Sequence, residues 1–445
     1  MSNFIEQPRY MCTLAAQQTV LGIKRAIPIV HAGPGCSSKL SQALNVDSGF
    51  QNNGYIGGGE VPSTNSSENE VVFGGEKKLK NTIDGTLRVL DGDLYIVLTG
   101  CTAEIVGDDV EQVVSKYRAQ GIPIVSVQTG GFLGNNYKGH ELVLQAIINQ
   151  YIGDVKPEVT KGLVNIFSVV PYQDTFWRAD LEEIKSLLQK IGLKVNILFG
   201  YDSAGVDEWK TIPNAQFNLV LSPWVGLDTA KLLENKYGTP YLHYPVLPIG
   251  ALETNEFLKT VGTFAGIGEE KINAVIEKEE HKYYGYVNSM AEFLTENKPI
   301  LAQDFYTIAD STYALGISNF LINEFSFFPK TQFIIDNPDS KYIETIKQSF
   351  NSILEDTEGE VIIENDGGKI HEIIKSQDPK EVIIFGSAWE KELSQNINGY
   401  LLNVSLPVSY RIVINKTYIG YRGGLNLIEE IYSKILDQKD LNLNN

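Results

Sequence analysis

A chain of 445 residues that is 43% hydrophobic and 21% charged has an ordinary globular composition, and its length predicts two or three domains of about 150 residues each. The formal net charge of −18 disfavours binding to nucleic acid or to anionic membrane surfaces, because both attract basic patches. No apolar run approaches the ~20 residues of a membrane span, so we expect no membrane association.

The chain begins with MSNFIEQPRYMC, which lacks the basic and then apolar pattern of a secretory signal. Three cysteines in so long a chain are too few for a disulfide framework. Both observations favour a reducing cytoplasmic location. The negative charge leaves room for a basic protein partner.

Short apolar runs alternate along the chain with amphipathic segments of helical length, which is typical of parallel sheets covered by helices. Buried strands are predicted at 94–99, 123–128, 195–199, 218–222, 332–335 and 381–386. Helices are predicted at 109–120, 178–191, 229–237 and 340–354. The pattern predicts an α/β fold of three Rossmann-like, doubly wound domains, which cover residues 1–155, 156–290 and 291–445.

Two polar segments interrupt this pattern. Residues 51–69 are rich in Gly, Asn and Ser and are predicted to form a loop, and a loop of that length is often functional. Residues 437–445 are polar and are predicted to be a frayed tail.

The three cysteines occupy distinctive settings. Cys12 precedes a stretch, 13–26, that can form a helix, Cys36 ends the sequence HAGPGC, and Cys101 ends the turn TGC. Glycine permits the backbone angles that a loop needs around a bulky iron–sulfur cluster. Buried structural thiols are the alternative interpretation, since free cysteine is commonly buried. The chain contains no CxxC pair, which argues against a zinc-ribbon site. Three thiols are one too few for a four-cysteine cluster within one chain, so a second chain would complete the site.

These cysteine motifs, with Cys101 in TGCTAEIVGDD, resemble those of the nitrogenase component 1 family. That family includes both subunits of the molybdenum–iron protein, their cofactor-assembly paralogues and the dark-operative protochlorophyllide reductases. The resemblance covers nearly the whole chain. Further matching segments are VFGGEKKL at 72–79, GGFLG at 130–134, GSAWEK at 386–391 and GYRGG at 420–424.

The resemblance implies that Cys12, Cys36 and Cys101 bind an iron–sulfur cluster at an interface with an α-like paralogous subunit, in a heterodimer or α2β2 heterotetramer. The cluster would be a [4Fe-4S] cluster or a P-cluster-like [8Fe-7S] cluster. Gly131 stands where β subunits of the family tend to carry a serine, which makes the simpler four-iron cluster an alternative.

The chain resembles the β side of the family because the anchors of the catalytic metal cofactor are missing. The corresponding cysteine region contains Ser222, and the late segment 416–421 contains no histidine. A serine hydroxyl is a poor substitute for a thiolate toward iron. The chain also lacks a phosphate-loop sequence and should not hydrolyse ATP itself, so if ATP drives the reaction a separate donor must supply that energy. The resemblance implies that this donor is an ATP-hydrolysing iron protein.

Several other residues have two interpretations each. His31 would donate a hydrogen bond to a cluster sulfide or loop carbonyl, or it is a satisfied loop histidine. Asp108 and Asp109 mark a helix start, where they would cap the helix or face the electron donor, and Glu104 shares the second role more weakly. The remaining histidines show no metal-binding spacing and are interpreted as structural or surface residues: His140, His243, His281 and His371.

We therefore expect an electron-relay subunit of a nitrogenase-like oxidoreductase, which is catalytic only within a complex. A scaffold on which a nitrogenase-type metal cofactor is assembled is the alternative, because the same cysteines would serve it. A third hypothesis is a metal-free protein that binds a small molecule between Rossmann-like lobes.

Overall fold

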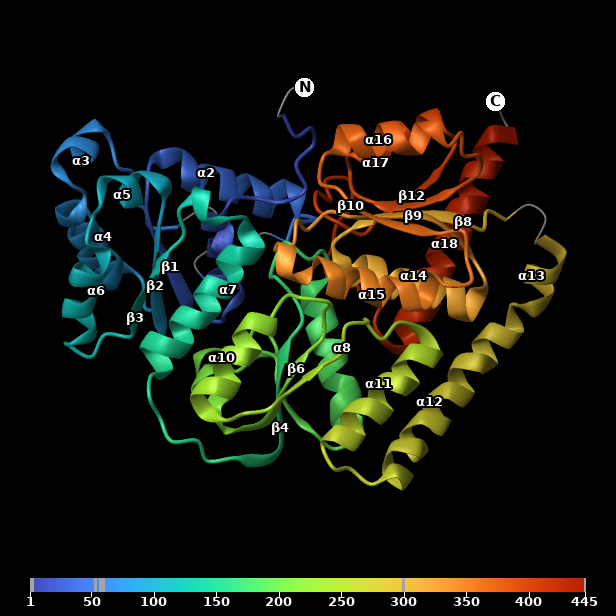
Figure 1. The fold of residues 1–445 in the computed structure, drawn as a ribbon, viewed down its shortest axis with the longest axis horizontal. Helices are drawn as coiled ribbons and strands as arrows, with labels where there is room; N and C mark the ends of the chain where they lie inside the picture. Colours follow the sequence, from blue (N-terminus) through green and yellow to red (C-terminus); the bar gives the residue numbers. More distant parts are fainter. Residues whose placement is uncertain (1–3, 52–53, 56–60, 298–300, 444–445) are drawn as a thin grey trace.

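The computed structural model describes residues 4–51, 54–55, 61–297 and 301–443. Three sheets follow one another along the chain, and every strand pair within them is parallel. In Figure 1 the three sheets occupy separate parts of the molecule, each with helices against it. The α/β prediction with parallel sheets is confirmed.

The first sheet contains β1 (Ala26–His31), β2 (Leu94–Thr99) and β3 (Ile124–Gln128), in that spatial order. Both β1 and β2 are buried along their whole length. On the free edge of β1, Val30 N–H donates to Pro62 O (2.8 Å) and Thr64 N–H donates to Val30 O (2.9 Å). Residues 62–64 thus pair with one edge of β1, and β2 pairs with the other edge. Such a reversal of direction leaves a crevice at the carboxyl ends of the strands.

Helices cover both faces of this sheet. They are α1 (Gln17–Gly22), α2 (Pro34–Gln42), α3 (Glu68–Phe73), α4 (Glu76–Val89), α5 (Cys101–Val106), α6 (Val110–Arg118) and α7 (Asn136–Ala146). Side chains of β1 alternate between the faces: Ile27 and Ile29 pack with α4 and α6, whereas Ala26 and Val30 join the main core. The predicted helix at 109–120 is α6.

The second sheet has the order β5-β4-β6-β7, and the third has the order β10-β9-β8-β11-β12. Each begins with a central strand, β4 or β8, and adds strands on one side and then on the other, which is the doubly wound pattern. The strand bounds are β4 (Thr160–Phe167), β5 (Lys194–Asn196), β6 (Ala215–Val220), β7 (Tyr241–His243), β8 (Asp304–Ala309), β9 (Phe328–Ile334), β10 (Glu360–Ile363), β11 (Ile383–Gly386) and β12 (Tyr400–Asn403).

The remaining α-helices lie around these two sheets (Figure 1). They are α8 (Trp177–Lys190), α9 (Val206–Thr211), α10 (Leu227–Tyr237), α11 (Gly250–Phe264), α12 (Glu269–Ser289), α13 (Ala291–Asn297), α14 (Ser311–Phe325), α15 (Ile343–Leu354), α16 (Gly367–Ser376), α17 (Glu390–Asn396) and α18 (Gly420–Leu443). The predicted helices at 178–191, 229–237 and 340–354 correspond to α8, α10 and α15. One continuous core joins the three sheets, and α18 packs against α8, α11 and α12. The division at residues 155 and 290 falls between the sheets and stays a prediction.

Three predicted segments differ from the structure. The strand predicted at 195–199 ends at Asn196, because Leu198 adopts a φ of +66° while its N–H donates to Glu208 Oε2 (2.7 Å). The tail predicted at 437–445 is helical to Leu443 in α18, where Gln438 donates to Gly399 O, while residues 444–445 lie outside the described residues. The predicted loop at 51–69 includes the edge pairing with β1 and the start of α3, while residues 52–53 and 56–60 lie outside the described residues.

Among the helices that the structure describes, none combines the length and the apolarity that a membrane crossing requires.

Candidate functional site

The three cysteines lie at the carboxyl edge of the first sheet, where the crevice is expected. Cys36 is in the first turn of α2 after β1, and Cys101 is the first residue of α5 after β2. Cys12 immediately precedes a short 3₁₀ helix and pairs as an isolated antiparallel bridge with Asn135, beyond β3. All three thiols are free and exposed in the single chain.

Gly131 lies beside two of the three cysteines. Its N–H donates to Cys101 Sγ (3.0 Å), and a Cβ placed on it would lie 3.2 Å from Cys101 Sγ and 3.5 Å from Cys12 Cβ. The pKa of the Cys36 thiol lies above its usual range, because protein around it desolvates the thiolate and because Cys12 and Cys101 lie close enough to repel its charge. The three thiols therefore share one electrostatic environment.

The arrangement does not suit a single metal ion. No group of three His, Cys, Asp or Glu side chains in the described ranges is placed to hold one. Thiolates that bind an iron–sulfur cluster each contact a different iron atom, so they stand farther apart than the ligands of one zinc ion. Three exposed thiols, with Gly131 beside Cys12 and Cys101 and without a side chain to fill the space, fit a cluster whose outer side is open to another chain.

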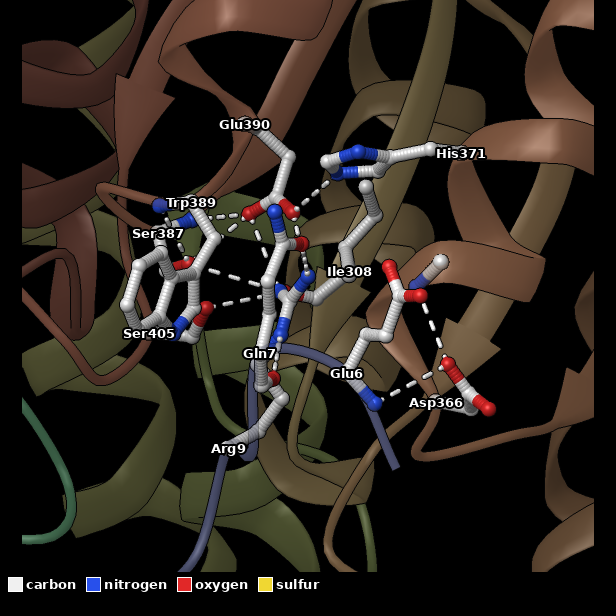
Figure 2. Close-up of polar contacts among 11 residues, drawn as sticks. Glu6, Gln7, Arg9, Ile308, Asp366, His371, Ser387, Trp389, Glu390 and Ser405 are labelled. Carbon is white, nitrogen blue, oxygen red and sulfur yellow. Dashed lines mark hydrogen bonds and ion pairs between the residues drawn. The ribbon is translucent and has the colours of Figure 1, made fainter. Parts of the chain in front are cut away.

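The segment before Cys12 is fastened to the third sheet by a buried ion pair (Figure 2). Arg9 Nη2 lies 2.6 Å from Glu390 Oε1 and Arg9 Nη1 lies 3.0 Å from Oε2, and neither side chain is exposed. Ser387 N–H (2.7 Å) and His371 Nε2 (3.1 Å) also contact this carboxylate. Burial raises the pKa of Glu390, but the Arg9 charge and these hydrogen bonds outweigh burial and hold the pKa at about 2.

Contacts from the first two sheets complete the support of Cys12. Gln173 Nε2 donates to Arg9 O (3.0 Å), and Asn136 Nδ2 donates to Gln173 Oε1 (2.9 Å). Met11 N–H donates to Asn136 Oδ1 (3.1 Å) and Met11 O accepts from Asn136 N–H (2.9 Å). This role of Arg9 was not predicted, because its partner Glu390 lies 381 positions away in the sequence.

His31 is a structural histidine, and the interpretation that it contacts the cluster is not supported. It is fully buried at the end of β1, with Nδ1 3.1 Å from Thr64 Oγ1 and Nε2 2.9 Å from Asp108 Oδ2. Both ring nitrogens therefore have partners. Burial lowers the pKa of His31, and the neighbouring Asp108 opposes this shift.

Asp108 and Asp109 have different roles. Asp108 Oδ1 accepts from Gly75 N–H (2.8 Å), so this carboxylate holds the start of α4 against β1. Asp109 is the predicted cap: its Oδ1 accepts from Gln112 N–H (2.9 Å) at the start of α6. Asp109 is also exposed, so its charge can act on a protein that approaches.

The other histidines are structural or surface residues, as predicted. His140 Nδ1 lies 2.9 Å from Thr19 Oγ1, His243 Nε2 lies 2.9 Å from Ser222 O, and His371 belongs to the Glu390 network. His281 is exposed on α12. Ser222 is fully buried, and its hydroxyl donates to Val225 O (2.7 Å) within a local turn, which leaves it engaged by the fold.

Four buried aspartates that sequence analysis did not identify gather where the second and third sheets meet: Asp174, Asp180, Asp310 and Asp336. Burial raises the pKa of all four, to about 7 for Asp180 and Asp310, and the charges of neighbouring aspartates add to the effect for Asp174 and Asp310. No pattern in the sequence marked them as a group, since Asp174 and Asp180 are far along the chain from Asp310 and Asp336.

The described surface carries two groups of exposed apolar side chains. The docking patch consists of Val72 and Phe73 on α3 and Ile105 on α5; Phe73 is 84% and Ile105 is 75% exposed. Ile105 lies one helical turn after Cys101.

The partner patch consists of Val46, Phe50, Tyr410, Ile412 and Ile414, of which Ile412 is 71% and Ile414 is 80% exposed. Hydrogen bonds from Val413 N–H to Gly49 O and from Val408 N–H to Asp47 O join its two segments. Contiguous exposed apolar patches mark interaction sites in many proteins.

The family described as Nitrogenase component 1 type Oxidoreductase matches residues 12–436. One chain of the light-independent protochlorophyllide reductase of Angiopteris evecta is 22% identical over 382 residues, covering 81% of this chain and 70% of the relative. The nitrogenase molybdenum-iron protein beta chain of Methanococcus maripaludis is 24% identical over 459 residues, covering 96% and 93%. The solved structure "Nitrogenase Cp1 at pH 6.5" has a similar fold, with a TM-score of 0.80 at 21% identity over 98% of this chain and 94% of the other. This chain therefore belongs to the nitrogenase component 1 family of oxidoreductases, as its cysteine motifs predicted.

Proposed function

We propose that this chain is the β-like electron-relay subunit of a nitrogenase-like reductase, and that Cys12, Cys36 and Cys101 bind an iron–sulfur cluster shared with an α-like subunit. The observation that carries the proposal is the grouping of three exposed thiols at the carboxyl edge of the first sheet, with Gly131 beside Cys12 and Cys101. When bound, such a cluster supplies a site that accepts and passes on single electrons. A turnover assay separates this proposal from the scaffold alternative, because an electron relay supports repeated substrate reduction with its partners and a scaffold does not.

The chain's own residues favour a particular ligand set. Three thiolates come from this chain, and the remaining ligands come from the α-like partner. Gly131 contributes no side-chain oxygen beside Cys101, which favours a [4Fe-4S] cluster over a P-cluster-like [8Fe-7S] cluster. Free thiols at such a site suit the reducing cytoplasm that the sequence predicts.

The partner patch is the surface on which we place the α-like subunit. One of its two segments follows α2, the helix that carries Cys36, because the chain runs from this helix through Asp47 to Phe50. Ile412 and Ile414 point outward on either side of the buried Val413, as alternate residues of an extended segment do. A heterodimer, or an α2β2 heterotetramer built from it, would bury these side chains.

The docking patch is the surface on which we place the electron donor, a separate ATP-hydrolysing iron protein. The donor must come close to the cluster, and Ile105 is only four residues, about 6 Å of helix rise, from Cys101. Asp109 lies just beyond α5 and adds a negative charge to this face. A donor with a complementary basic rim fits it.

The test is replacement of Cys36 by Ala in anaerobically purified protein co-expressed with its α-like partner. We expect the wild-type complex to contain iron and acid-labile sulfide, and the C36A complex to lose most of both. Replacement of Ser222 by Ala is the control, because Ser222 is buried away from the thiols in its own turn. Unchanged iron content and an unchanged electron paramagnetic resonance spectrum in C36A would overturn the proposal.

A further inference from the structure

Glu104 lies on α5 one turn after Cys101, and its carboxylate is directed at the Gly130–Gly131 turn beyond β3. We infer that Glu104 is a positioning residue: it holds this turn so that Gly131 N–H donates to Cys101 Sγ, and the hydrogen bond raises the reduction potential of the cluster. The inference rests on the proposed function for its redox consequence, whereas the contacts themselves belong to the chain alone.

Glu104 holds the turn through a small network at the ends of β2 and β3. Its Oε1 accepts from Gly130 N–H (2.7 Å) and from the Thr99 hydroxyl. Thr99 Oγ1 in turn accepts from Thr129 N–H (3.1 Å), and Thr129 Oγ1 donates to Thr99 O (2.8 Å). The turn is therefore fixed from both sides immediately before the residue that meets Cys101.

The two glycines fit tightly against this network. A Cβ on Gly130 would lie 2.6 Å from Glu104 Oε2, and a Cβ on Gly131 would lie 3.2 Å from Cys101 Sγ. The turn thus packs directly against Glu104 on one side and against the thiol on the other. A change in the length of the Glu104 side chain should move the Gly131 N–H relative to Sγ.

The direction of the redox effect follows from charge. Reduction adds one negative charge to the cluster and its thiolates, and an N–H dipole directed at a ligand sulfur stabilises that charge. Loss of this hydrogen bond should therefore lower the midpoint potential. A carboxylate charge near the cluster has the opposite effect, since negative charge disfavours reduction, so the two contributions of Glu104 are separable.

Two variants make that separation. E104D keeps the charge but draws the oxygens back by one methylene, whereas E104Q removes the charge and keeps an oxygen that can accept from Gly130 N–H. Midpoint potentials are measured by electron paramagnetic resonance titration of the anaerobic complex, together with iron content. In the iron-free chain, amide hydrogen exchange is measured over residues 129–133.

We expect E104D to shift the midpoint potential to more negative values, or to lose iron, and to speed amide exchange at 129–133 several-fold, while E104Q stays near wild type in exchange. An E104D potential equal to wild type with iron retained would overturn the inference, as would exchange rates that are the same in all three proteins. A potential that moves only in E104Q would assign the effect to charge and also overturn it. Iron-free wild-type complex would instead refute the proposed function, and the exchange rates would then decide whether Glu104 holds the turn.

Discussion

Arg9 and Glu390 form a fully buried, bidentate ion pair between residues 381 positions apart, and the pair joins the segment before Cys12 to the carboxyl end of β11. This position lies beside the point where the order of the third sheet reverses around β8, which is where doubly wound sheets commonly bind a ligand. In this chain the position is filled by Arg9. The third sheet therefore supports the placement of Cys12.

Replacement of Arg9 by Met should lower the free energy of unfolding by about 3–5 kcal/mol, because it leaves the Glu390 carboxylate buried without its main partner. The measurement is urea unfolding followed by circular dichroism. Arg25→Met is the matched control, since Arg25 forms exposed ion pairs with Asp91 and Asp93, whose loss should lower the free energy of unfolding much less. Equal losses in the two variants would contradict a special role for the buried pair.

The buried aspartates predict a contribution to stability that falls as the pH rises from about 5 to 8. The folded pKa values of Asp180 and Asp310 are about 7, above the usual unfolded value near 3.9, so the folded state binds more protons in this interval. Stability from these groups is fully present below the unfolded pKa and is lost as the pH passes through the folded pKa. Over this range wild type should therefore lose melting temperature relative to a variant that lacks one of these carboxyl groups.

Asp310→Asn tests the source of that pH dependence. Asp310 Oδ1 accepts from Thr312 N–H and Tyr313 N–H at the start of α14, and the amide oxygen of Asn can accept the same bonds. The variant should keep the helix cap and show a flatter dependence of melting temperature on pH. A slope that matches wild type would assign the pH dependence to other groups.

The partner patch predicts that Ile412→Asp weakens association with the α-like partner tenfold or more without lowering the melting temperature of the isolated chain. Ile412 is 71% exposed, so a charge there costs little until a partner buries it. Affinity is measured by pull-down at graded concentrations. Val159→Asp, an exposed apolar position at the amino end of β4, is the control. If Ile412→Asp associates with the α-like partner as tightly as wild type, this face is not the interface with that partner.

The alternation of apolar and amphipathic segments predicted the parallel α/β architecture, because buried parallel strands leave near-continuous apolar runs such as 94–99. Short-range patterns also located the Asp109 cap. They could not reveal contacts between distant segments: nothing near Arg9 in sequence identifies Glu390, and nothing in TGCTAEIVGDD indicates that Glu104 turns toward Gly130. The strand predicted at 195–199 was too long because a tertiary hydrogen bond from Leu198 to Glu208 overrides local propensity.

The last prediction concerns Asp109, whose charge and capping role can be tested separately. Asp109→Asn should leave the melting temperature nearly unchanged, because an amide oxygen can still accept from Gln112 N–H, whereas Asp109→Ala should cost about 1 kcal/mol through loss of the cap. If the charge guides a basic electron donor, the Asn variant should slow electron transfer at low salt. The difference from wild type should fade as the Debye length falls to about 8 Å at physiological ionic strength. The measurement is the salt dependence of the single-turnover electron-transfer rate. An Asn variant with wild-type rates at every salt concentration would show that Asp109 acts only as a helix cap, and the donor would then have to approach the cluster by another face.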